Sequence, residues 1–275
     1  MLADAHEAGL DVVALSDHDT LAGLAEAAEA ARQLGVTLVP ALELSAQVID
    51  DHPESKPRSV HLLGYLIDPD NSELVEEMKR IRSHRRDRLA LMVEKLSEDY
   101  DLTWEDVVHQ IGDGATPGRP HIAQVMIDKG IVANTDEAFA THLRADGPYH
   151  VPHYAPRLAR ALDIITASGG VPVLAHPYTA ARSGAVDHTQ SMSDILSDYE
   201  KLVDLGLLGL EIDHRENTEE GKALLRSVAE QFGLIVTGSS DYHGDKKRNQ
   251  LGENLTTPDN FERIQILGTG SKPLS

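Results

Sequence analysis

The sequence contains no cysteine, so disulfides and thiolate metal sites are excluded and any metal must be held by imidazole and carboxylate groups. Aromatic residues make up only 4% of the chain, and no apolar run approaches the length of a membrane span. Neither a signal-peptide pattern nor a membrane segment is therefore expected, and we expect a cytoplasmic protein.

Basic residues are in the minority, with 25 Lys and Arg against 45 Asp and Glu. The formal charge of -20 repels duplex nucleic acid, so we expect no duplex partner and no membrane partner. Small phosphates remain compatible with this charge, because bound divalent ions would reverse the field locally.

What the sequence does contain is an alternation of apolar runs with stretches of helical period. This alternation predicts an α/β fold with a parallel sheet and crossover helices, and the near-continuous apolar strands are typical of a barrel. The predicted strands are residues 11–17, 36–45, 59–68, 169–177, 207–213 and 234–241. Between them, from about residue 71, the sequence becomes polar and helical. We therefore predict a barrel in two parts, residues 1–70 and 151–275, with an inserted helical subdomain at residues 71–150.

A residue able to bind a metal ion lies at or near the end of each apolar run. These residues are Asp17, His18, Glu43, His61, His176, Glu211, Asp241 and His243. Each histidine has an ordinary structural explanation as a hydrogen-bonded residue, and the aspartates have one as helix N-caps. Their recurrence favours one cluster instead, because the carboxyl ends of parallel barrel strands converge on one face. Such a ligand set suits Mn, Fe or Zn ions, without distinguishing among them.

At these positions the sequence resembles the PHP (polymerase and histidinol phosphatase) family of metal-dependent phosphoesterases. The matching strings are "ALSDHDT", "VPALELS", "VHLLGY", "VLAHP" and "GSSDYH". The strings "TPGRPHIAQVMIDKG" and "YHVP" also resemble the helical insertion of the subgroup that acts on nucleoside phosphates and short oligonucleotide ends. The resemblance implies a distorted (β/α)7 barrel that holds up to three divalent metal ions.

The resemblance also implies a role for each matching residue. Glu43 would bridge two ions, with His61 and His176 on one of them and Asp241 on the other. His18 and His243 would hold the third ion, and Glu43, Asp241 and His243 would be the catalytic group. Asp17 and Asp19 would orient ligand imidazoles from behind, and Glu211 would shape the pocket.

One segment of the family pattern has no counterpart in this sequence. The family begins with a strand that carries a His-x-His pair, whereas this sequence begins in what corresponds to the first helix. We expect Met1 to be an internal methionine of a truncated gene. The first ion would then keep only Glu43 and Asp241, and the third only His18 and His243. The barrel would also lack a strand and expose two edges.

The insert supplies the candidate substrate ligands, Arg119 and His121, because a guanidinium fork matches phosphate oxygens. The alternative for Arg119 is a solvent-facing loop arginine. A basic run, Arg82, Arg85, Arg86 and Arg88, could attract an oligonucleotide, but a solvated helix face paired with glutamates is the favoured interpretation. Tyr149 and Tyr154 could stack on a base, with core packing as the default.

These observations predict a metal-dependent phosphoesterase that acts on nucleoside phosphates such as 3',5'-bisphosphates or AMP, and that could trim short oligonucleotides. The partner would be a small nucleotide or a short oligonucleotide. One alternative is a sugar- or histidinol-phosphate phosphatase. A second alternative, of another class, is a non-catalytic barrel that binds a nucleotide, which the unmatched ligands favour. The oligomeric state is left open.

Overall fold

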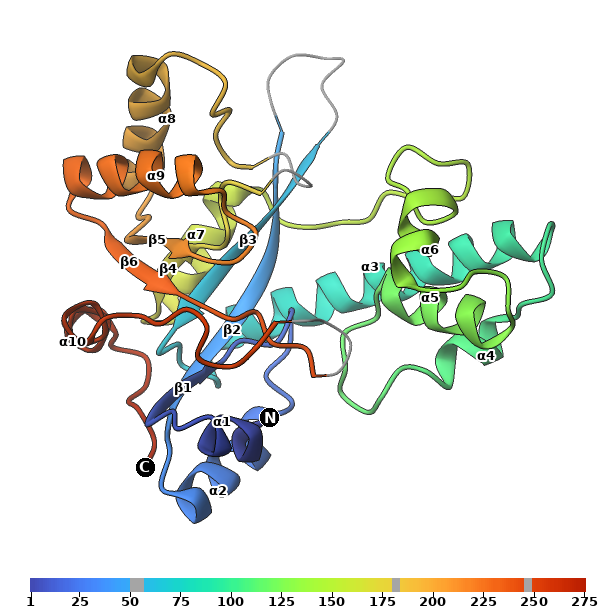
Figure 1. Ribbon diagram of the computed structural model, residues 1–275, viewed down its shortest axis with the longest axis horizontal. Coiled ribbons are helices and arrows are strands. Elements are labelled where there is room, and N and C mark those ends of the chain that lie inside the picture. Colours follow the sequence, from blue (N-terminus) through green and yellow to red (C-terminus); the bar gives the residue numbers. More distant parts are fainter. Residues whose placement is uncertain (50–56, 180–183, 245–248) are drawn as a thin grey trace. The chain divides into compact units, whose positions relative to one another are not determined.

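The computed structural model describes residues 1–49, 57–179, 184–244 and 249–275. The chain forms two compact units, and the first of them combines Met1–Val75 with Pro156–Ser275. The second unit is Glu76–Ala155. All the strands of the described ranges belong to the first, which we call the strand unit, and the second, the helical unit, contains helices (Figure 1).

The strand unit is built on one mixed sheet that forms a half-barrel. Its strands are β1 (Val12–Leu15), β2 (Thr37–Val48), β3 (Arg58–Tyr65), β4 (Val171–Leu174), β5 (Gly209–Asp213) and β6 (Ile235–Gly238). They lie side by side in chain order, so β1 and β6 are the edge strands. Each corresponds to a predicted strand, and the predicted α/β barrel class is confirmed.

The direction of β3 differs from the sequence prediction. β1 pairs with β2, β4 with β5 and β5 with β6 in parallel, as expected, whereas β3 is antiparallel to both β2 and β4. The prediction of a parallel sheet is therefore wrong for this strand. The physical reason is its short connection to β2, since a parallel crossover needs about a dozen residues or more and usually a helix.

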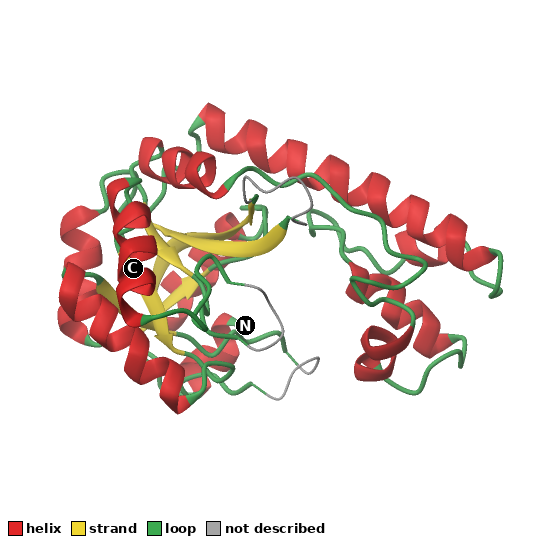
Figure 2. Ribbon diagram, turned by 90° about the horizontal axis from the view of Figure 1, so that it is seen from above, coloured by secondary structure: helices red, strands yellow, loops and turns green. Residues whose placement is uncertain are grey.

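Within the described ranges six helices complete the strand unit, and Figure 2 shows helices around the strands. They are α1 (Leu2–Glu7), α2 (Leu24–Leu34), α7 (Leu158–Ala167), α8 (Met192–Asp204), α9 (Glu219–Phe232) and α10 (Pro258–Leu267). The predicted end of the first long helix at Gly35 is confirmed, because Gly35 adopts a left-handed φ of 69° just after α2. The side chain of Thr218 caps α9 by accepting a hydrogen bond from the Gly221 backbone N–H.

Burial along the strands follows the barrel expectation. In β2 the nine residues from Leu38 to Ala46 are all buried, so both faces of this strand are covered. Between the two edge strands lies a cavity of about 660 Å³ lined by residues of β1 and β6, with Val12 and Gly238 among them. Apolar side chains from α10, such as Phe261, also line this cavity.

The helical unit packs around the C-terminal part of α3 (Ser72–Ser97), as Figure 1 shows. Its other helices are α4 (Trp104–Val108), α5 (Arg119–Asp128) and α6 (Thr135–Thr141). Its core contains Leu89, Met92, Leu96, Val107, Ile122, Met126 and Leu143, with Trp104 partly buried against them. Across the described residues, no helix has the length and apolar character needed to cross a membrane.

Candidate metal centre

The turn after β1 is fastened to β2 at the predicted site. The Glu43 N–H donates to the Asp17 carbonyl (3.1 Å), and the Asp19 N–H donates to the Glu43 carbonyl (3.0 Å). His18, between these two bonds, forms a parallel bridge with Glu43. The sequence Asp-His-Asp thus continues the β1–β2 ladder by one step and brings His18 beside the Glu43 carboxylate.

Strand register brings His61 to the same carboxylate. Ser45 lies opposite His61 in the antiparallel β2–β3 pair, and Glu43 lies opposite Leu63. Residues two apart on a strand share a face, so Glu43 and His61 are diagonal neighbours on one face of the sheet. Because β3 is antiparallel, a residue near its beginning reaches the edge at which β2 and β4 end.

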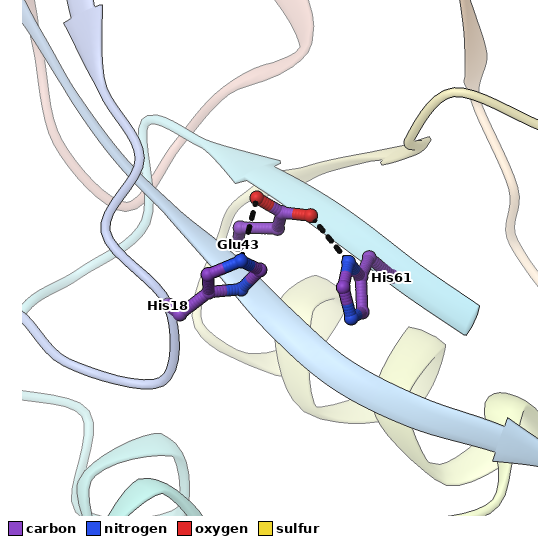
Figure 3. A group of neighbouring side chains, drawn as sticks. All are labelled: His18, Glu43 and His61. Atoms are coloured by element: carbon purple, nitrogen blue, oxygen red, sulfur yellow. Dashed lines mark ion pairs between the residues drawn. The ribbon is translucent and has the colours of Figure 1, made fainter. Parts of the chain in front are cut away.

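The Glu43 carboxylate lies among three imidazoles. Its Oε1 is 2.6 Å from His61 Nδ1 and 3.3 Å from His176 Nε2, and its Oε2 is 3.6 Å from His18 Nε2. Figure 3 shows the carboxylate of Glu43 between the rings of His18 and His61. Burial by itself raises the pKa of Glu43, but the charges of His18 and His61 and hydrogen bonds from His176 and His61 outweigh it. The pKa of Glu43 is therefore held well below its usual range.

A second group follows β6. Asp241 Oδ1 lies 3.5 Å from His243 Nδ1, and Asp241 Oδ2 lies 3.9 Å from His214 Nε2. His214 is fully buried, and its ring packs 5.3 Å from that of His176. The sequence analysis did not select His214, although its place three residues after Glu211 in "EIDH" was a usable signal.

Most of the predicted site residues line the same cavity of about 660 Å³. These are Asp17, His18, Glu43, His176, Glu211, Asp241 and His243. His61 joins the group through its contact with Glu43. The structure thus brings together residues that are more than 200 positions apart in the sequence.

Backbone strain is concentrated at residues predicted to belong to the site. Among the described residues four that are not glycine have a positive φ, and three of them are Asp19 (52°), His176 (31°) and Asp241 (49°). Such conformations cost about 1–3 kcal/mol each, and they persist where the surrounding structure enforces them, commonly at functional sites.

Buried hydrogen bonds hold two of these residues, Asp19 and His176, in place. The fully buried Asp19 carboxylate accepts from the backbone N–H (2.7 Å) and the hydroxyl (2.8 Å) of Ser45, a residue that the sequence analysis missed. Glu211 accepts from the His176 N–H at 2.9 Å and so fixes the backbone that carries this imidazole. Burial raises the pKa of Glu211, and His176 and His214 only partly oppose this shift. Burial likewise raises the pKa of Asp17, against the charges of His18 and His243.

The donor set fits a divalent metal ion. One ligand atom from each of His18, Glu43 and His61 lies within 4.8 Å of the other two, and Glu43 and His61 are nearly buried. Two imidazole nitrogens and a carboxylate oxygen suit borderline divalent ions.

The two predicted substrate ligands belong to the helical unit. Arg119 is the first residue of α5, where it is half-buried, and its Nη1 donates to the Leu143 carbonyl at 2.7 Å. The alternative of a solvent-facing loop arginine is therefore wrong. His121 lies in the first turn of α5, as expected, with its Nδ1 3.1 Å from the Gly118 nitrogen.

The basic run on α3 also differs from its favoured interpretation. Arg88 is buried, with 8% of its surface exposed, and its Nε donates to the Val151 carbonyl at 2.7 Å, so a solvated face is wrong for this residue. Tyr149 donates its hydroxyl to Asp99 (2.6 Å) and packs against the helical core, which confirms the core-packing default. Tyr154 donates to Glu77 (2.6 Å).

No family model matches the chain. A solved structure from Bifidobacterium adolescentis, described as a metal-dependent phosphoesterase, superposes with a TM-score of 0.86 at 35% identity, over 98% of this chain and 90% of that one. The chain belongs to the PHP family of metal-dependent phosphoesterases. Other relatives of this PHP chain include a 5'-3' exoribonuclease of Haemophilus influenzae, 26% identical over 93% of this chain and 87% of its own length. A 3',5'-nucleoside bisphosphate phosphatase of Chromobacterium violaceum is 28% identical over 84% and 76%.

Proposed function

We propose that the protein hydrolyses phosphate esters of nucleotides with bound divalent metal ions. The observation that carries this proposal is the Glu43 carboxylate among the imidazoles of His18, His61 and His176, next to a cavity that also exposes Asp241. The names of the relatives, an exoribonuclease and a bisphosphate phosphatase, support a nucleotide as the substrate.

The metal ions would number up to three and be Mn, Fe or Zn. Their proposed ligands are His18, Glu43, His61, His176, Asp241 and His243, of which Glu43, Asp241 and His243 would be nearest the reaction. A bound divalent ion supplies a Lewis acid for the phosphate oxygens and for the attacking water. The residues Asp19 and Glu211 would keep the ligand groups in place, through their hydrogen bonds to Ser45 and to the His176 backbone.

The substrate would be a nucleoside phosphate, such as a 3',5'-bisphosphate or AMP, or the end of a short oligonucleotide. Arg119 and His121 would bind a phosphate of this substrate, because guanidinium and imidazole N–H groups match phosphate oxygens. We place the protein in the cytoplasm, because a chain without cysteine suits a reducing compartment.

The test is manganese-dependent phosphate release from adenosine 3',5'-bisphosphate, with a Glu43→Gln variant. We expect release by the wild type and a loss of more than about 100-fold in the variant, since even outer partners of metal ligands are worth about 10- to 100-fold. Glu29→Gln, at an exposed glutamate paired with Arg32, is the matched control and should keep the activity.

A panel containing histidinol phosphate and glucose 6-phosphate checks the substrate class. Faster release from either of these than from the nucleotide would assign the protein to sugar- or histidinol-phosphate phosphatases. Equal release by the wild type and by Glu43→Gln would contradict the proposed site. Absence of release from every substrate would favour the non-catalytic barrel.

A further inference from the structure

His214, in the turn that follows β5, is completely buried, with 0% of its surface exposed. Backbone hydrogen bonds close this turn, since the His214 N–H donates to the Ile212 carbonyl (2.9 Å) and the His214 carbonyl accepts from the Asn217 N–H (3.2 Å). The Asn217 side-chain amide also donates to the carbonyls of Glu211 (3.0 Å) and Ile212 (2.9 Å). The imidazole of His214 is therefore carried by a turn whose backbone is held at several points.

The register of β5 and β6 brings His214 next to Asp241. The pairing shifts by one residue near the end of β5, so that Asp213 lies opposite Gly238. The Asp213 carbonyl accepts a hydrogen bond from the Ser239 N–H at 3.0 Å. His214 follows Asp213 directly, and Asp241 comes two residues after Ser239. As a result, His214 Nε2 lies 3.9 Å from Asp241 Oδ2.

The hydrogen bond at Nδ1 assigns the tautomer of the His214 ring. The Glu216 N–H donates to this nitrogen at 3.1 Å, so Nδ1 carries a lone pair and the ring proton is on Nε2. The buried Nε2–H has no hydrogen-bond acceptor within residues 1–49, 57–179, 184–244 and 249–275. A buried donor without an acceptor is destabilising, so its presence in a native structure calls for an explanation.

The geometry excludes two roles for His214. A metal ligand would need its lone pair at Nε2, which would place the ring proton on Nδ1, against the Glu216 N–H. A contact with the substrate would need access to the cavity, whereas His214 is completely buried and Asp241 lines the cavity instead. The remaining role is donation from Nε2 to the Asp241 carboxylate.

The distance between the two groups is compatible with such a bond. At 3.9 Å it is about 1 Å longer than a hydrogen bond, and hydrogen bonds between active-site groups commonly shorten when the ligand binds. The second carboxylate oxygen, Asp241 Oδ1, lies 3.5 Å from His243 Nδ1. The two oxygens thus have different neighbours, and a donor at Oδ2 fixes the rotation of the whole carboxylate.

We propose that His214 is a positioning residue, whose Nε2–H donates to Asp241 Oδ2 and holds this carboxylate in the orientation that binds a divalent metal ion. The proposal rests on the proposed function, in which Asp241 is a metal ligand. Ligand carboxylates are commonly held by a hydrogen-bond partner of this kind, and loss of the partner costs about 10- to 100-fold in metal affinity or activity.

The first experiment measures the affinity for Mn²⁺ by isothermal titration calorimetry on the full chain. His214→Leu removes the donor and should weaken Mn²⁺ binding about 10- to 100-fold. His214→Gln places an amide N–H near the position of Nε2 and should recover most of this loss, which a purely structural role of the imidazole would not allow. His6→Gln, at an exposed histidine of α1, is the matched control and should bind Mn²⁺ like the wild type.

Each outcome of this titration has a separate meaning. Equal affinity in the wild type and in His214→Leu would overturn the positioning role and leave the proposed function intact. An equal loss in His214→Leu and His214→Gln would overturn it as well, because the donor would then be irrelevant. Absence of Mn²⁺ binding by the wild type would overturn the metal-dependent function together with the positioning role.

A spectroscopic experiment tests the tautomer in the wild type. The ¹⁵N chemical shifts of an imidazole distinguish a protonated from an unprotonated ring nitrogen, and the spectrum of His214→Gln identifies the signals of His214. Zn²⁺ is diamagnetic and suits the same ligand types. We expect the proton on Nε2 with and without Zn²⁺, and a downfield shift of this proton on addition of Zn²⁺ that is lost in Asp241→Asn. A proton on Nδ1 in the presence of Zn²⁺ would make His214 a metal ligand and overturn the proposal.

Discussion

Each unit buries a charged side chain, but the neighbours stabilise the charge in one unit and destabilise it in the other. In the strand unit the Glu43 carboxylate has His18, His61 and His176 around it, and these neighbours hold its pKa well below the usual range. In the helical unit Arg88 lies with other cations, and burial with these charges lowers its pKa to about 10. Both pKa values are lowered. A lowered pKa means that the charged form is stabilised for an acid such as Glu43 and destabilised for a base such as Arg88. The first site offers lone pairs to a cation, whereas the Arg88 guanidinium donates to the Val151 carbonyl.

The largest expected effect is on the strand unit, from a change at Asp19. Asp19→Ala removes the buried acceptor of the Ser45 N–H and hydroxyl and places alanine at a positive φ of 52°, so we expect a loss of about 3 kcal/mol in unfolding free energy. Asp19→Asn should cost less, because asparagine keeps one acceptor and tolerates this backbone conformation. Urea unfolding followed by circular dichroism measures the difference.

The matched control for Asp19 is Asp11→Ala, at an exposed aspartate just before β1. This control should stay within about 0.5 kcal/mol of the wild type. Trp104 is the single tryptophan and packs against the core of the helical unit, so its fluorescence reports on that unit. The Trp104 signal should keep its midpoint in Asp19→Ala if the units unfold separately. A shift of the Trp104 midpoint as large as the shift in circular dichroism would show instead that the two units unfold together in one cooperative transition.

In the strand unit, sequence pattern predicted that several of the predicted site residues would lie together. Apolar runs that end in His or acidic residues place His18 and Glu43 at neighbouring strand ends, and their bridge in the structure follows from that pattern. The direction of β3 was not predictable from periodicity, because the alternation of apolar runs with helical stretches does not indicate in which direction a strand runs. Ser45 was missed because its importance depends on the tertiary position of the Asp19 carboxylate, which no local pattern contains.

In the helical unit, sequence pattern predicted the helices better than the burial of their charges. An arginine-rich helix is usually solvated, and that rule gave the wrong environment for Arg88. Its burial depends on the Val151 carbonyl, 63 residues later in the chain, which accepts from its Nε. Contacts of this kind are set by packing between segments, so composition and spacing carry no signal for them.

Removal of the metal should destabilise the strand unit and leave the helical unit unchanged. We expect this effect to be smaller than that of Asp19→Ala. A ligand at 100 times its dissociation constant stabilises the native state by about 2.7 kcal/mol, so EDTA should lower the unfolding midpoint of the metal-loaded strand unit by several degrees. The Trp104 midpoint should stay constant. In Glu43→Gln the EDTA effect should shrink, and an undiminished effect would place the metal elsewhere. Circular dichroism and fluorescence on the same sample measure both units.

Over a single pH unit, the smallest expected effect is a pH dependence in the helical unit, from His153. Its folded pKa of about 3 lies below the ordinary 6.5, so the folded state keeps this imidazole neutral while the unfolded chain binds a proton. The resulting stability is fully present above pH 6.5 and is lost as the pH falls toward 3. The unfolding free energy reported by Trp104 should therefore rise with pH in this window. Because at most about one proton differs between the folded and unfolded states, the slope should be at most about 1.4 kcal/mol per pH unit.

His153→Asn should flatten this dependence, whereas His109→Asn, at an exposed histidine of the same unit, should leave it unchanged. Equal slopes in the wild type and in His153→Asn would assign the pH dependence to another group.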